Sequence, residues 1–146
     1  MTKGVLVDSA QDVSWSVERL RDFLHDCAAS EPAEEADRVR EAIAVLPQRH
    51  GSHFQAQAVE SLLENGAALC AVLVILGPQA RFMLSRGEDG RCLATVLAAD
   101  GHEEMVAEGT TLALALLTAQ ASARLVGLER AERVAQRAVP LTARLH

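Results

Sequence analysis

Three turn signals divide the middle of the chain into short segments. They are Gly77-Pro78, Glu88-Asp89-Gly90 and Asp100-Gly101, and each combines residues that favour tight turns. Segments linked this closely pair with their neighbours in antiparallel orientation, because a parallel connection needs a dozen or more residues. The turns therefore predict an antiparallel meander of three or four strands, at about residues 69–108.

Alternation of side chains predicts strands at about 81–86, 92–98 and 102–108. In the first of these, Phe82 and Leu84 share one face, and Met83 lies on the other. In the last, one face is apolar and the other is mixed: Met105 and Ala107 oppose Glu104, Val106 and Glu108.

The apolar run at residues 69–76 leaves the number of strands open. Its length and its content of valine and isoleucine favour a buried fourth strand at the start of the meander. The same residues could instead extend the preceding helix through Gly66, which would leave three strands. We favour four strands, although periodicity alone does not separate the two structures.

Helical spacing of apolar residues predicts helices on both sides of the meander. The N-terminal helices are expected at about 10–29, 32–46 and 53–65. After the meander, Gly109-Thr110-Thr111 precede an apolar helix at about 110–126, and Gly127 separates it from a short basic helix at about 128–138. Together these elements predict a single α+β domain spanning residues 1–146.

One short stretch resembles a known family. Residues 105–119, MVAEGTTLALALLTA, are similar to the last strand and the helix opening of HicB-type antitoxins. The resemblance covers fifteen of 146 residues and implies a strand, a Gly–Thr junction and a capped helix. The preceding helices depart from that family, and we infer no function from it.

Charge argues against a nucleic-acid partner. The net charge is −6, and phosphate binding needs the opposite sign. The exception is the segment 124–146, which has five arginines and two glutamates. No aromatic residue lies between these arginines to stack on bases, so we interpret them as a solvated helix face. The arginines are Arg124, Arg130, Arg133, Arg137 and Arg144.

Three cysteines, Cys27, Cys70 and Cys92, form no C-x-x-C pair. An odd number of unpaired thiols is typical of a reducing cytoplasm. We expect no signal peptide, and the longest apolar run has ten residues where a membrane helix needs about twenty. Thirteen arginines against one lysine suggest a GC-rich bacterial genome. We therefore expect a bacterial cytoplasmic protein without a membrane partner.

Candidate catalytic groups are few. His50 and His53 flank a predicted helix start and could bind a transition metal, although no second cluster has zinc-type spacing. His102 lies beside Glu103 and Glu104 and could act as a general base. A polar loop and a charged edge strand explain both groups as well, and we expect no catalytic residue and no cofactor.

The apolar character of the helix at 110–126 suggests a partner. It is apolar nearly all round, so it lies either between the sheet and the other helices or against a second chain. We expect a non-catalytic module that self-associates, as a dimer, through Leu112, Leu116 and Ala119. The alternatives are a small-molecule-binding protein with a pocket between sheet and helices, and a metal- or His/Glu-dependent enzyme.

Overall fold

The computed structural model describes residues 2–46, 52–98 and 103–138, with side chains for 16–46, 55–98 and 103–137. The predicted α+β class is confirmed, with helices before a three-stranded antiparallel sheet and a long apolar helix after it. In chain order the elements are α1 (Thr2–Ala29), the 3-10 helix η1 (Pro32–Glu34), α2 (Glu35–Val45), α3 (Ser52–Glu64), α4 (Ala68–Leu76), β1 (Phe82–Arg86), β2 (Cys92–Leu97), β3 (Glu104–Gly109) and α5 (Leu112–Ala138).

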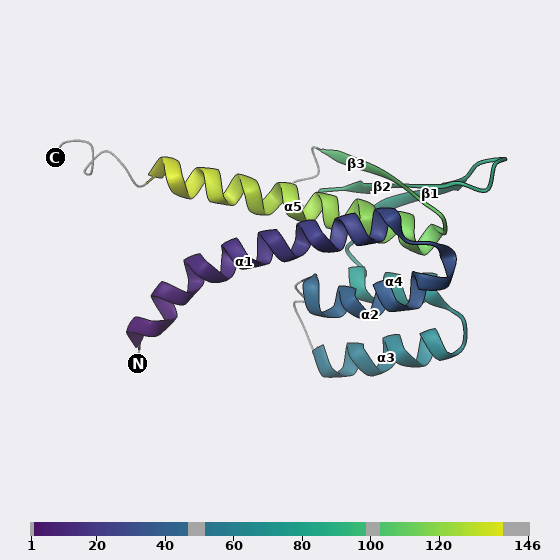
Figure 1. The fold of residues 1–146 in the computed structure, drawn as a ribbon, viewed down its shortest axis with the longest axis horizontal. Helices are drawn as coiled ribbons and strands as arrows, with labels where there is room; N and C mark the ends of the chain where they lie inside the picture. Colours follow the sequence, from purple (N-terminus) through teal and green to yellow (C-terminus); the bar gives the residue numbers. More distant parts are fainter. Residues whose placement is uncertain (1, 47–51, 99–102, 139–146) are drawn as a thin grey trace.

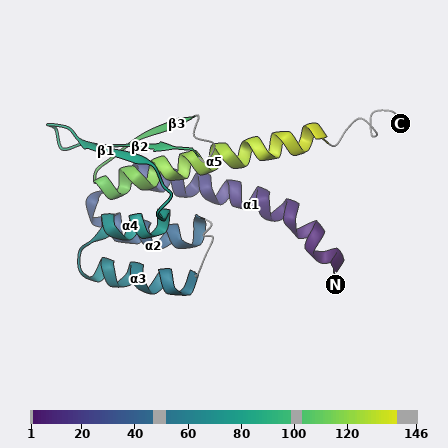
Figure 2. The same cartoon turned by 180° about the vertical axis from the view of Figure 1, so that it is seen from behind.

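Helix α5 lies at the centre of the molecule. Its first half contacts all three strands on one side and α1, α2 and α4 on the others (Figure 1). Helix α3 is the outermost layer and packs on α4 and α2. Seen from both sides, every helix lies on the same side of the sheet (Figures 1 and 2). The sheet therefore has an inner face toward α5 and an outer face toward solvent.

The start of α5 is almost completely buried because its side chains are apolar on every side. All seven residues from 113 to 119 are buried. The only polar one, Thr118, donates its hydroxyl to the Leu114 carbonyl at 2.7 Å, so no donor is left unpaired there. Of the two arrangements open for this helix, the structure shows the one in which it lies between the sheet and the other helices.

Three consecutive residues fix the junction between β3 and α5. The Thr111 hydroxyl accepts a hydrogen bond from the Leu114 N–H at 3.1 Å and caps the helix. The Thr110 hydroxyl donates to the Ser30 carbonyl at 3.0 Å, which ties this junction to the end of α1. At Gly109 an added Cβ would lie 2.5 Å from the Ala115 nitrogen, so only glycine fits. The strand, Gly–Thr junction and capped helix implied by the resemblance are present.

The expected fourth strand is wrong: residues 68–76 form helix α4. The chain turns at Gly66, whose φ of +70° suits glycine, and a new helix begins at Ala68. The buried residues are spaced as in a helix and face the core, whereas Cys70 and Leu73 are exposed: the buried set is Ala68, Ala71, Val72 and Ile75. Packing on α3, α2 and α5 outweighs the strand preference of valine and isoleucine.

Two helix boundaries also differ from prediction. Helix α1 begins at Thr2, eight residues before the expected start at 10. Helix α5 continues through Gly127, so the separate basic helix at 128–138 is its second half. A glycine inside a helix costs about 1 kcal/mol relative to alanine. Leu125 and Leu128 pack against the core on either side of it and offset this cost.

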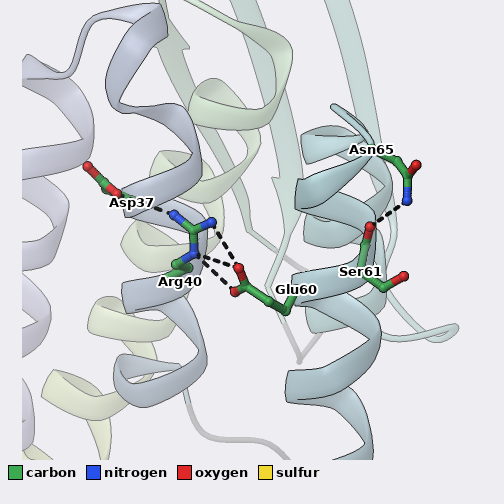
Figure 3. Close-up of polar contacts among 5 residues, drawn as sticks. All are labelled: Asp37, Arg40, Glu60, Ser61 and Asn65. Atoms are coloured by element: carbon green, nitrogen blue, oxygen red, sulfur yellow. Dashed lines mark hydrogen bonds and ion pairs between the residues drawn. The ribbon is translucent and has the colours of Figure 1, made fainter.

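An exposed ion pair joins α2 to α3 (Figure 3). The Arg40 guanidinium donates from Nε and Nη2 to both carboxylate oxygens of Glu60, at 2.9–3.2 Å, and contacts Asp37 at 3.4 Å. Its hydrogen bonds raise the pKa of Arg40 and lower the pKa of Glu60. Both groups are exposed, so we assign the pair a role in orienting α3 more than in stability.

Two glycine-to-alanine variants test the β3–α5 junction and the continuity of α5. Gly109→Ala should destabilise the fold by about 2 kcal/mol or more, because its Cβ meets the α5 backbone. Gly127→Ala should stabilise it by about 0.5–1 kcal/mol, because that helical position has nothing within 4 Å. Urea unfolding measures both. A stable Gly109→Ala variant, or a destabilised Gly127→Ala variant, would contradict these local structures.

Candidate interaction surface

The outer face of the sheet carries the most exposed apolar side chains of the strands. The strand register places Met83, Thr95 and Val106 in one row across β1, β2 and β3. Met83 is 73% exposed and Val106 is 62% exposed. The inner residues of β2 (Cys92, Ala94 and Val96) are buried instead, so the two faces of the sheet differ.

Two further rows complete this face, one on each side of the first. Toward the β1–β2 turn, Ser85, Leu93 and Glu108 are aligned, and Leu93 is 40% exposed. Toward the other end, Leu97 pairs with Glu104, and its N–H donates to the Arg81 carbonyl at 3.1 Å. We call these three rows the outer-face patch: Arg81, Met83, Ser85, Leu93, Thr95, Leu97, Glu104, Val106 and Glu108.

Charges lie at the borders of the outer-face patch, and its middle row is mainly apolar, with Met83 and Val106 on either side of Thr95. Arg91 and Glu108 form an exposed ion pair at 3.0 Å near the β1–β2 turn. Arg81 borders β1 and Glu104 lies on β3, at the other end of the sheet. Within the described residues neither Arg81 nor Glu104 forms an ion pair. An apolar centre with a polar border is typical of protein–protein contacts.

The predicted interface residues lie inside the chain. Leu116 and Ala119 are fully buried in the core, and Leu112 is partly buried against it. The apolar surface of α5 that suggested a partner is thus covered by the chain's own sheet and helices. A self-association surface has to consist of other residues.

The predicted metal and acid–base residues are only partly described. His50 and His102 lie outside the described residues, and His53 lies in α3 without a described side chain. Glu103 forms an ion pair with Arg130 of α5, whereas Glu104 is exposed on the outer face. Among the side chains that are described, no three His, Cys, Asp or Glu residues are grouped to hold a metal ion.

The three cysteines have different surroundings. Cys27 is buried in the core, and burial raises the pKa of its thiol to about 12. The nearby Arg38 guanidinium lowers this pKa, but burial outweighs it. Cys92 is also buried, and Cys70 is exposed on α4. A thiol that stays protonated at neutral pH is a poor nucleophile, which argues against a catalytic Cys27.

A shallow apolar groove lies between the end of α4 and β1. It has a volume of about 450 Å³ and is open to solvent. Its lining combines apolar side chains with turn residues: Leu73, Val74, Gly77, Pro78, Ala80 and Phe82. These residues offer no charged or hydroxyl group to orient a small ligand, which binding pockets usually do.

Within the described ranges, α5 is the helix that is long and apolar enough to cross a membrane by length and composition alone. Its most apolar part is the part buried between the sheet and the other helices. The second half carries the predicted basic face. Glu129 pairs with Arg21 of α1 at 2.8 Å, and Arg130 pairs with Glu103. Arg144 lies outside the described residues.

Comparison with protein-family models, with curated proteins and with solved structures finds no match to this chain. The surface itself is therefore the basis for a function. Sequence reasoning placed Met83 on the face opposite Phe82 and Leu84, and Val106 on the face opposite Met105 and Ala107, but did not connect them. The signal was available, since both occupy outward positions of predicted strands, but their common row depends on the strand register.

Thiol chemistry tests the placement of the cysteines. In the native protein Cys70 alone should react rapidly with a maleimide, because Cys27 and Cys92 are buried. All three should react in denaturant. Mass spectrometry after a short labelling pulse counts the adducts, and a Cys70→Ser variant is the control. Rapid labelling of that variant under native conditions would contradict the described core.

Proposed function

We propose that this chain is a non-catalytic interaction module that associates with a second copy of itself through the outer-face patch. The observation that carries this proposal is the exposure of Met83 and Val106, at the two ends of one row with Thr95 between them, on a face that no described helix covers. Water contact with such a patch is unfavourable, and a second protein surface removes it. A closed twofold dimer is the commonest assembly of identical chains, and in it the same patch of both copies forms the contact.

The size of the patch predicts a weak, reversible dimer. It is three strands wide and six residues long at β2. With strands about 4.8 Å apart and about 3.4 Å per residue, its footprint is roughly 300 Å². Contacts that bury less than about 1,200 Å² in total belong to transient complexes. We expect a dissociation constant of about ten micromolar or weaker.

The energies agree with that range. Covering a methionine or valine side chain completely contributes about 1.5–3 kcal/mol, and a dimer covers Met83 and Val106 twice. Joining two molecules costs about 4–15 kcal/mol of translational and rotational freedom. The gain, about 6–12 kcal/mol for four side chains, is therefore of the same size as the cost. A single charge introduced into this face should therefore weaken self-association strongly.

A matched pair of variants tests the proposed surface. Val106 on the outer face and Val134 on α5 are exposed to nearly the same extent, at 62% and 65%. Val106→Glu should weaken the dimer at least about tenfold, because the dimer would bury an unpaired carboxylate. Val134→Glu should leave it unchanged. Sedimentation equilibrium over a concentration series measures both constants.

Circular dichroism and thermal unfolding show whether both variants remain folded. A wild-type protein that stays monomeric up to about 1 mM would overturn the proposed self-association. Equal weakening by the two glutamates would move the contact away from the sheet. Leu116→Glu is no test, because Leu116 is fully buried and the variant would disrupt the core.

A further inference from the structure

We infer that the two copies stack their outer faces about a twofold axis parallel to β2, so that β1 of one copy lies over β3 of the other. This inference rests on the proposed function and adds the orientation of the partner. It follows from the positions of the charges in the three rows of the outer-face patch.

Two symmetric arrangements keep the strands of the two copies aligned when one sheet stacks on a copy of itself. The twofold axis lies between the sheets and runs either parallel to the strands or across them. An axis parallel to the strands keeps each row opposite itself and exchanges β1 with β3. An axis across the strands keeps each strand opposite itself and exchanges the two outer rows.

The axis across the strands places like charges together. The row with Glu104 would then lie over the row with Glu108, so these two carboxylates of β3 would face each other twice in the dimer. Arg81 would face Ser85 and would gain no charged partner. Opposed like charges at a contact are unfavourable, and the cation nearest to Glu108, Arg91, already pairs with it inside the same copy.

The axis parallel to the strands places opposite charges together. Arg81 at the β1 border then faces Glu104 of the second copy, and the pair occurs twice. Met83 faces Val106 of the second copy in the middle row, so the two most exposed apolar side chains of the sheet cover each other. Charge and apolar contact both favour this arrangement.

The remaining residues fit the same axis. Leu93 and Leu97 of the central strand β2 lie beside the axis and meet their own equivalents. Arg91 directly precedes β2, so the two Arg91 side chains meet beside the axis, each paired with Glu108 of its own copy at 3.0 Å. Stacked sheets lie about 10 Å apart, a distance that the long side chains of Arg81 and Glu104 can bridge. The helices that pack on the sheet lie on its inner side, and α5 extends beyond the sheet at one end (Figures 1 and 2).

Charge reversal tests this orientation. Arg81→Glu and Glu104→Arg should each weaken the dimer about tenfold, because each replaces two attractive pairs with two repulsive ones. The double variant should recover most of the wild-type affinity. Arg86→Glu is the control, since Arg86 is exposed on the same strand but belongs to the inner-face set of residues. Sedimentation equilibrium at low salt gives the four dissociation constants.

Cross-linking provides a second, independent measurement. Leu97 meets Leu97 of the second copy only with the axis parallel to β2, whereas the other axis places Leu97 over Leu93. In a Cys70→Ser background, Leu97→Cys should therefore be joined to itself by a short bismaleimide. Cys27 and Cys92 are buried and should not interfere.

The outcomes separate the two proposals. A wild-type dimer that Val106→Glu disrupts, but whose single charge reversals are not rescued by the double variant, would refute the orientation and leave the outer-face contact standing. Cross-linking of Leu97→Cys only to a Leu93→Cys copy would establish the other axis. Absence of any wild-type dimer would overturn both proposals together.

Discussion

Burial of the first half of α5 is the constraint on which the rest of the structure depends. Seven consecutive residues without a charge cannot face water, so the sheet, α1, α2 and α4 are arranged around them. With only four aromatic residues in the chain, this core consists mainly of alanine, leucine and valine. Small side chains allow close approach, and at Gly109 the strand backbone lies directly against the helix. The hydroxyls of Thr110, Thr111 and Thr118 form hydrogen bonds with backbone groups of this tightly packed region.

One consequence is an unequal sheet. Helix α5 covers the inner face, and all the other described helices stack behind it on the same side. The outer face is left with Met83, Leu93 and Val106 in contact with water. The arrangement that buries the apolar surface of α5 thus leaves apolar side chains exposed on the outer face of the sheet. Charges at the borders of this face disfavour unspecific aggregation, and they favour some orientations of a partner over others.

Periodic elements are predicted well from the sequence, whereas the packing partners of each element are predicted poorly. The alternation around Met83 and Val106 and the Gly–Thr start of α5 follow local chemistry, and both are confirmed. The run at 69–76 shows no helical period because its exposed positions, Cys70 and Leu73, are apolar too, and packing on three neighbours decides its form. Leu116 and Ala119 suggested a partner because sequence cannot show that the chain itself surrounds them. The position of Arg81 and Glu104 at the two ends of one row depends on strand register, which the lengths of the turns set.

Methionine methyl NMR is the most direct test of the claim that the outer face meets a second copy. Met83 is 73% exposed on the outer face, whereas Met105 belongs to the inner face and is partly buried. We predict that the Met83 methyl signal shifts as the protein concentration rises from about 10 μM to about 1 mM, while the Met105 signal stays constant. A Met83 signal that is independent of concentration, or equal shifts at Met83 and Met105, would contradict association through this face.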